Sequence, residues 1–153
     1  MSTFTKAAFS LPGAGQIADA FGRHIIRISA DRTGGSLGVF ESEVPAGEGP
    51  PFHVHDREEE FFVVLSGRFG FWCEDDHVEL GAGGTIVIPR GTAHRFQNIG
   101  SETGKLLVVM TPGGFEGFFP AMQAEAPTTD IGIAALAARF NLRFVPAPAE
   151  IAA

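Results

Sequence analysis

The 153-residue chain contains no tyrosine, a single cysteine and only two lysines. The lack of tyrosine excludes every mechanism in which a phenol acts as acid, base or hydrogen-bond donor. Because Cys73 has no second cysteine to pair with, an intrachain disulfide and a cysteine-based zinc site are excluded as well. This cysteine usage is compatible with a reducing compartment.

Long apolar runs are also missing. Runs such as residues 61–65 and 106–110 fall far short of the roughly 20 residues that a membrane helix needs. Polar residues, Pro12 and Gly13 interrupt the N-terminal stretch, which therefore lacks the apolar region of roughly 7–15 residues found in a secretory signal. We expect a cytoplasmic protein that does not cross a membrane.

Positive charge is scarce. Eleven Lys and Arg residues stand against eighteen Asp and Glu residues, so the formal net charge is −7. A negative protein repels phosphate backbones and anionic lipid headgroups. We therefore expect a small-molecule substrate as the partner, and neither nucleic acid nor a membrane surface.

Short apolar or alternating runs, separated by Gly, Pro, Asp or Asn about every ten residues, fill residues 23–112 and are typical of an all-β sandwich or barrel. Residues 1–22 read as an N-terminal arm, and residues 113–153 as a C-terminal segment with a short helix near 130–141. That helix is expected to have Asp130 as its N-cap and Asn141 as a left-handed stop. The strands are expected at residues 23–29, 36–44, 52–55, 59–65, 68–74, 77–80, 85–88, 93–99 and 105–111.

Three histidines and a glutamate form the candidate metal-ligand set. His53 and His55 are two residues apart in a strand, so both imidazoles point to the same face. Glu60 begins the next run, and His94 begins a later alternating run. Three imidazoles and one carboxylate suit one divalent transition metal per chain, whether Fe, Mn, Ni, Cu or Zn.

At these residues the sequence resembles the cupin superfamily, which is defined by two histidine-containing motifs. The first motif, G-x5-H-x-H-x(3,4)-E-x6-G, is matched by Gly47, His53, His55, Glu60 and Gly67. The second motif, G-x5-P-x-G-x2-H-x3-N, is matched by Gly83, Pro89, Gly91, His94 and Asn98. The resemblance implies a double-stranded β-helix, the cupin or jelly-roll barrel, with the metal held inside it by His53, His55, Glu60 and His94.

The segment TPGGFEGFF, the Ala-rich helix and the late RFVP resemble the bacterial cupins grouped as quercetinase-like. Members called by that name include dioxygenases, while fold analogy alone does not identify a substrate. Phe62 and Phe96 lie two residues from Glu60 and His94 and face the same way, so we expect them to line an apolar pocket beside the metal. Phe52, Phe69 and Phe71 are expected in the core.

Several other polar residues are assigned ordinary structural roles. Glu58 and Glu59 read as a solvated charge run. His24 and His77 match neither motif and are expected to be surface or hydrogen-bonded histidines. Cys73 is expected to be a small buried apolar residue. Surface salt bridges are expected for Arg90 and Arg95.

Three functions remain open at this point. The first is an oxygenase that binds a small aromatic or enol substrate, with Glu60 serving both as ligand and as the catalytic base. The second is a non-redox isomerase or lyase that uses the metal as a Lewis acid; a phosphosugar substrate fits it poorly because Lys6 and Lys105 are the only lysines. The third is a small-molecule-binding cupin without turnover. Oxygen uptake separates the first from the other two.

We predict a homodimer, because a barrel made of two sheets leaves edge strands and the resemblance implies that such monomers commonly pair. Sedimentation at micromolar concentration is expected to show a species of twice the 16.2 kDa chain mass. A species of 16.2 kDa under these conditions contradicts the prediction.

Overall fold

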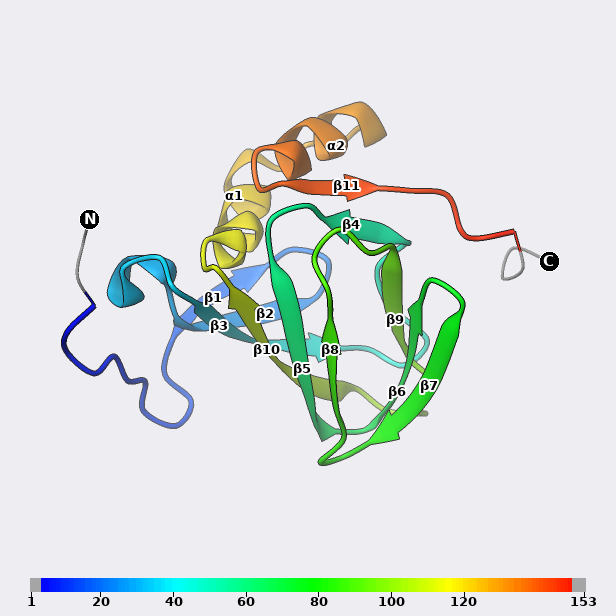
Figure 1. Cartoon of the computed structure of the whole chain (residues 1–153), viewed down its shortest axis with the longest axis horizontal. Helices are drawn as coiled ribbons and strands as arrows, with labels where there is room; N and C mark the ends of the chain where they lie inside the picture. The colour runs from blue at the N-terminus through cyan, green and yellow to red at the C-terminus, as the bar shows by residue number, and fades with distance from the viewer. Residues whose placement is uncertain (1–3, 150–153) are drawn as a thin grey trace.

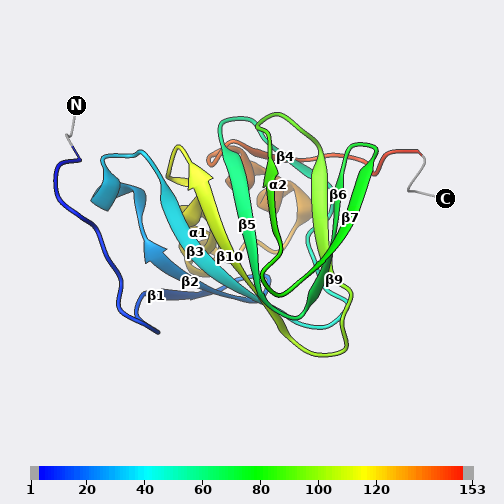
Figure 2. The same ribbon diagram turned by 60° about the horizontal axis from the view of Figure 1, so that its bottom comes forward.

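Two antiparallel β-sheets face each other in the computed structural model, which describes residues 4–149 (Figures 1 and 2). The six-stranded sheet has the order β1 (Gln16–Asp19), β2 (Arg23–Ile28), β3 (Gly38–Val44), β10 (Gly104–Thr111), β5 (Glu59–Ser66) and β8 (Thr85–Ile88). The five-stranded sheet has the order β11 (Leu142–Phe144), β4 (His53–His55), β9 (His94–Asn98), β6 (Arg68–Cys73) and β7 (Asp76–Gly81). Neighbouring strands are often distant in sequence, as in a jelly roll, and the predicted double-stranded β-helix is confirmed.

The interior receives alternate side chains from both sheets. In β10, residues at even positions from Gly104 to Met110 are buried, while the residues between them face outward. The same alternation runs through β3 and β5, as expected for strands with one solvated face. The largest fully buried apolar side chains are those of Phe62, Phe69, Phe71, Ile88, Leu106 and Met110.

The nine predicted strands form within two residues of their expected bounds, but two further strands were missed. β1 lies in the predicted N-terminal arm and pairs with β2. β11 lies in the predicted C-terminal segment and pairs with β4. Both are short and occupy sheet edges, so their pairing depends on a neighbouring strand rather than on a pattern of their own.

Helices cover one side of the sheets (Figure 1). A 3-10 turn, η1 (Ala30–Thr33), precedes β3, and η2 (Phe115–Gly117) leads into α1 (Phe118–Glu125) and α2 (Asp130–Ala138). The N-cap prediction for α2 is wrong: Thr129 caps it, because its Oγ1 accepts a hydrogen bond from the Gly132 amide at 3.0 Å. Asn141 is left-handed as expected, with φ of 58°, but lies beyond the helix end. None of the described helices is long and apolar enough to cross a membrane.

His24 is part of the packing under α1. Its ring stacks on Phe119 with a centroid distance of 3.6 Å. Its Nδ1 pairs with Ser42 Oγ at 2.8 Å and its Nε2 with the Ala20 carbonyl at 3.0 Å. Burial lowers the pKa of this imidazole to about 4. His24 is therefore a hydrogen-bonded core histidine, as predicted.

Asn98, at the end of β9, joins the end of β3 to the loop between β9 and β10. Its Nδ2 donates to the carbonyl oxygens of Val44 and Glu102, both at 2.8 Å, and its Oδ1 accepts from the Gly100 amide at 2.9 Å. The side chain is fully buried. Asn98 therefore has a structural role, which is to hold this loop against the end of β3.

We predict that Asn98→Ala lowers the free energy of unfolding of the metal-free protein by roughly 2–4 kcal/mol, because it leaves one buried and two part-buried backbone groups without their partner. Urea denaturation measures the change. Gln97→Ala is the matched control, since Gln97 is half-buried and makes only one bond to the backbone, to Gly47 at 2.9 Å. A loss below about 1 kcal/mol for both variants contradicts the prediction.

Candidate metal centre

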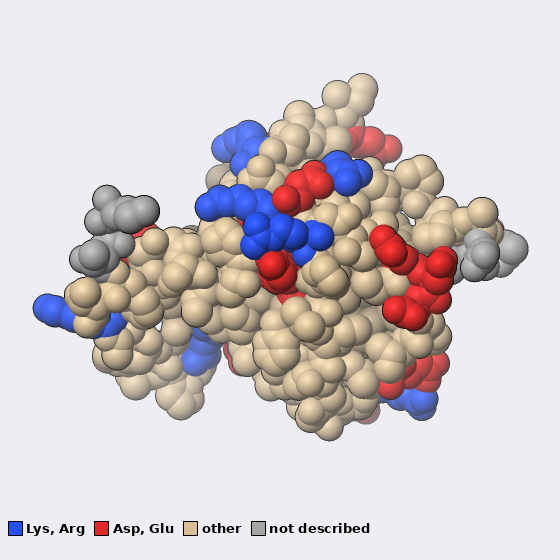
Figure 3. All heavy atoms as spheres, in the orientation of Figure 1, with Lys and Arg blue, Asp and Glu red and all other residues tan. Residues whose placement is uncertain are grey.

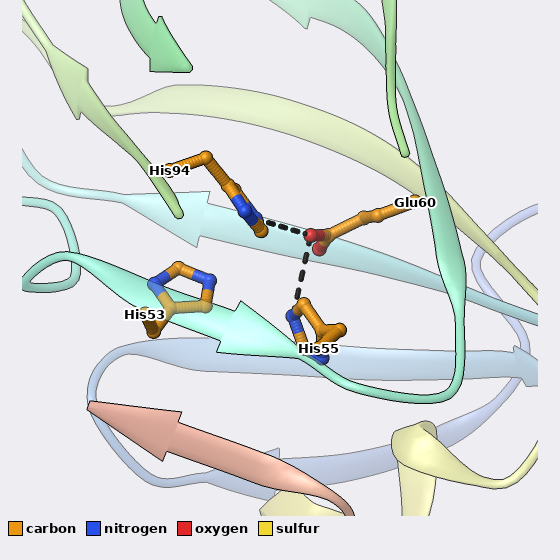
Figure 4. Close-up of side chains that lie close together, drawn as sticks. All are labelled: His53, His55, Glu60 and His94. Carbon is orange, nitrogen blue, oxygen red and sulfur yellow. Dashed lines mark hydrogen bonds and ion pairs between the residues drawn. The ribbon is translucent and has the colours of Figure 1, made fainter. Parts of the chain in front are cut away.

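The four predicted ligands come from both sheets and meet between them (Figure 4). His53 and His55 are the first and last residues of β4, so strand alternation turns both to the inner face. His94 begins β9 directly opposite His53. Glu60 enters from β5 in the other sheet. The topology therefore brings together residues that are up to 41 positions apart (94 − 53).

The donor atoms of these residues form one compact group. One donor atom from each of the four lies within 4.8 Å of the others, and all four residues are buried. Glu60 Oε2 lies 2.9 Å from His94 Nε2 and 3.3 Å from His55 Nε2. The His53 and His94 rings have a centroid distance of 4.3 Å.

Backbone hydrogen bonds set the orientation of two imidazoles. His53 Nδ1 lies 2.8 Å from the carbonyl oxygen of Pro51, and His94 Nδ1 lies 2.9 Å from that of Thr92. A carbonyl only accepts, so both Nδ1 atoms carry a proton and donate it. In the neutral rings the lone pair is then on Nε2, as a metal ligand requires.

The charges of the cluster also fit a metal. Burial by itself raises the pKa of Glu60, but His55 and His94 outweigh it and hold that pKa well below its usual range. Burial lowers the pKa of His53 to about 3, with His94 and His55 adding to the effect. For His94, burial lowers the pKa, but the Glu60 carboxylate outweighs it and raises the pKa above its usual value. An ionised carboxylate and a neutral imidazole are the forms that bind metal. Glu60 and His53 already favour those forms, whereas a protonated His94 would have to lose its Nε2 proton.

The donor chemistry points to a transition metal. Three nitrogen donors and one oxygen donor suit Fe, Mn, Ni, Cu or Zn better than Mg or Ca, which prefer oxygen alone. Four protein donors leave positions open on a metal that takes six, as a catalytic site requires. The cluster therefore fits a metal ion, which His53, His55, Glu60 and His94 would hold.

The prediction for Glu58 is wrong, whereas that for Glu59 is confirmed. Glu58 is buried, with only 2% of its surface exposed, and Arg57 and Glu59 on either side of it face outward. Burial raises the pKa of Glu58. Glu59 forms a surface ion pair with Arg90, whose Nε lies 2.8 Å from Glu59 Oε2. Period-two alternation back from Glu60 predicts an inward Glu58, and this signal was overlooked.

Basic and acidic side chains lie next to each other on the face shown in Figure 3, over the helices and the upper ends of the central strands. The predicted surface salt bridge of Arg90 is confirmed, since its Nη2 lies 2.6 Å from Glu59 Oε2. Arg95 does not form one: its guanidinium lies 4.8 Å from the Trp72 ring centroid and 5.9 Å from that of Phe52. Within residues 4–149 its side chain bonds to Gln97 rather than to an acid. The flat guanidinium stacks on aromatic faces, which sequence spacing does not show.

The other residues considered from the sequence pack against aromatic or core side chains. His77 is exposed and stacks on Trp72 at a centroid distance of 4.6 Å. Cys73 is half-buried and packs against the core, and burial raises the pKa of its thiol. Phe62 is buried and Phe96 half-buried, and their ring centroids are 5.5 Å apart inside the barrel.

Comparison with known proteins identifies the family. Residues 40–110, which include all four cluster residues, match the family described as Cupin domain. This stretch of the chain is a cupin domain. The structure of KdgF from Halomonas sp. covers 74% of this chain and 99% of its own chain, with a TM-score of 0.63 and 17% identity. This likeness shows the fold.

Two curated relatives match part of this chain. Quercetin 2,3-dioxygenase of Bacillus subtilis is 31% identical over 96 residues, which is 63% of this chain and 28% of the relative. Polyketide synthase CurC of Streptomyces cyaneus is 27% identical over 100 residues, which is 65% of this chain and 64% of the relative. The matched part thus spans less than two thirds of the length of either relative.

We predict that His94→Ala loses most of the bound metal, with affinity reduced at least about 100-fold, because it removes a direct ligand. The barrel is expected to stay folded, since the core and not the ion supplies stability at this size. Elemental analysis after dialysis and circular dichroism measure the two effects. His77→Ala is the control, because His77 is exposed and outside the cluster. Full metal occupancy in both His53→Ala and His94→Ala contradicts the assignment.

Proposed function

We propose that this cupin is a metal-dependent, dioxygenase-like enzyme that acts on a small aromatic or enol substrate, with one divalent transition metal per chain. The observation that carries the proposal is the buried set of three imidazoles and one carboxylate between the two sheets. When bound, the ion supplies a net charge of +1 for a substrate oxyanion, since three neutral imidazoles and one carboxylate contribute −1 against +2, and a redox-active ion also supplies oxygen chemistry.

The phenylalanine rings favour an aromatic substrate. Phe62 and Phe96 lie inside the barrel, two residues beyond Glu60 and His94 and therefore on the same face of each strand. Apolar aromatic side chains favour contact with a flat ring and exclude water from the interior beside the cluster. Polar contacts to the substrate then come from the cluster itself.

Glu60 is the proposed catalytic base. It supplies the carboxylate of the cluster, and its low pKa keeps it ionised at neutral pH. A substrate hydroxyl within hydrogen-bond reach would transfer its proton to a Glu60 oxygen, and a bound metal ion would supply positive charge to the anion that this leaves. His55 Nε2 and His94 Nε2 hold that carboxylate in place, at 3.3 and 2.9 Å.

The names of the two curated relatives support this substrate class. One is a dioxygenase of quercetin, and the other is called a polyketide synthase. Quercetin carries an enolic hydroxyl on an aromatic framework, and polyketides carry enolisable carbonyl groups. Both classes present an acidic hydroxyl of the kind that the Glu60 carboxylate would deprotonate.

We predict that Glu60→Gln lowers kcat roughly 10²- to 10⁴-fold and changes KM by only a few-fold, because the amide keeps an oxygen donor but accepts no proton. An oxygen electrode with a panel of flavonols and enolisable diketones, using iron-, manganese- and nickel-loaded protein, measures turnover. Glu59→Gln is the matched control, because Glu59 is part-exposed and outside the cluster.

The deciding comparison is anaerobic. Conversion of a substrate at an undiminished rate without oxygen contradicts the oxygenase and assigns a Lewis-acid isomerase or lyase instead. Metal-dependent binding of panel compounds without any conversion would indicate that the protein binds small molecules and does not catalyse their reaction.

A further inference from the structure

Two buried polar atoms face each other without hydrogen-bond partners beside the metal cluster. They are His55 Nδ1 and Glu58 Oε2, both unpaired within residues 4–149 and 3.9 Å apart. Each residue is only 2% exposed. An unpaired buried polar atom is costly, and most such atoms in folded proteins have a partner. The pair therefore requires an explanation.

His55 differs from the other two imidazoles of the cluster. His53 and His94 each donate from Nδ1 to a backbone carbonyl two residues earlier, and this leaves Nε2 facing the cluster. His55 also directs Nε2 at Glu60, at 3.3 Å, but its Nδ1 meets no backbone acceptor in the described chain. The acceptor position on that side is taken by Glu58.

The surroundings leave Glu58 as the acceptor for His55. The ring of Phe115, from η2, packs edge-on against His55 with a centroid distance of 4.5 Å and an interplanar angle of 85°. Glu58 directly precedes β5 and is buried, whereas Glu59, the first residue of β5, faces outward to its ion pair with Arg90. A carboxylate and an imidazole are thus enclosed together beside an aromatic ring.

We propose that Glu58 is a positioning residue, whose carboxylate accepts a hydrogen bond from His55 Nδ1 and so holds His55 Nε2 toward the metal. The inference rests on the metal centre of the proposed function. A side-chain rotation that shortens the contact by about 1 Å brings it into the hydrogen-bond range. A hydrogen bond from His55 Nδ1 to the Glu58 carboxylate would fix the tautomer of His55. It would also raise the basicity of His55 Nε2, the atom that would bind the metal.

Glu58 thereby adds a second buried carboxylate to the site without touching the metal. The two glutamates have separate roles. Glu60 acts at the metal and the substrate, whereas Glu58 acts through His55.

The test compares zinc affinity and the His55 tautomer in the full chain. Zinc is used because it is diamagnetic, which permits histidine ¹⁵N spectra of the loaded protein. Competition with a chelator is expected to show a loss of about 10- to 100-fold for Glu58→Ala and a smaller loss, of about three- to tenfold, for Glu58→Gln, whose amide oxygen still accepts a weaker bond. Glu59→Ala is the matched control and is expected to bind as the wild type does.

The ¹⁵N spectra report the tautomer of His55, which would not change if Glu58 had a merely structural role. The proton on His55 Nδ1 is expected to shift upfield in Glu58→Gln, and the fixed tautomer is expected to be lost in Glu58→Ala. If Glu58→Ala fails to fold by circular dichroism, the isosteric Glu58→Gln decides. Wild-type affinity and an unchanged His55 signal in every folded Glu58 variant overturn the inference alone, whereas a wild type that binds no zinc overturns the metal centre together with it.

Discussion

The packing of two β-sheets face to face is the constraint on which the rest of the molecule depends. Successive side chains of a strand alternate between its two faces, so each sheet contributes one residue in two to the interior. Glu60 enters from the six-stranded sheet, and His53, His55 and His94 enter from the five-stranded sheet. Neither sheet alone holds the complete donor set, so the cluster exists only when the two sheets are closed on each other.

The enclosure that creates the cluster also makes every polar atom in it dependent on a partner. Burial alone disfavours an ionised Glu60, and the imidazoles within 3.3 Å reverse that preference. Burial also disfavours protonation of His53, whose neutral form is the one that binds metal. A dry interior thus strengthens the attraction between the carboxylate and its neighbours, and it penalises any group left without one.

The histidines show how hydrogen bonding rather than residue type assigns a role. His24 is as buried as His53, but both of its ring nitrogens are used, by Ser42 and the Ala20 carbonyl. His53 and His94 each bond one nitrogen to a backbone carbonyl and turn the other toward the cluster, where His94 Nε2 pairs with Glu60 Oε2. A histidine of this barrel is therefore available to a metal when one of its nitrogens faces the other donor atoms of the cluster.

Alternation and motif spacing within the sequence determined the all-β class, most strand bounds and the inward direction of the four cluster residues, because these depend on neighbours a few residues away. Only the tertiary structure decided the pairing of the edge strands β1 and β11 and the stacking of Arg95 on Trp72. Each of these contacts joins separate strands or chain ends, and periodicity carries no record of which outward residue will lie beside another. The alternation of a strand therefore predicts which side chains point inward, whereas the residues that those side chains contact depend on how the strands are arranged in space.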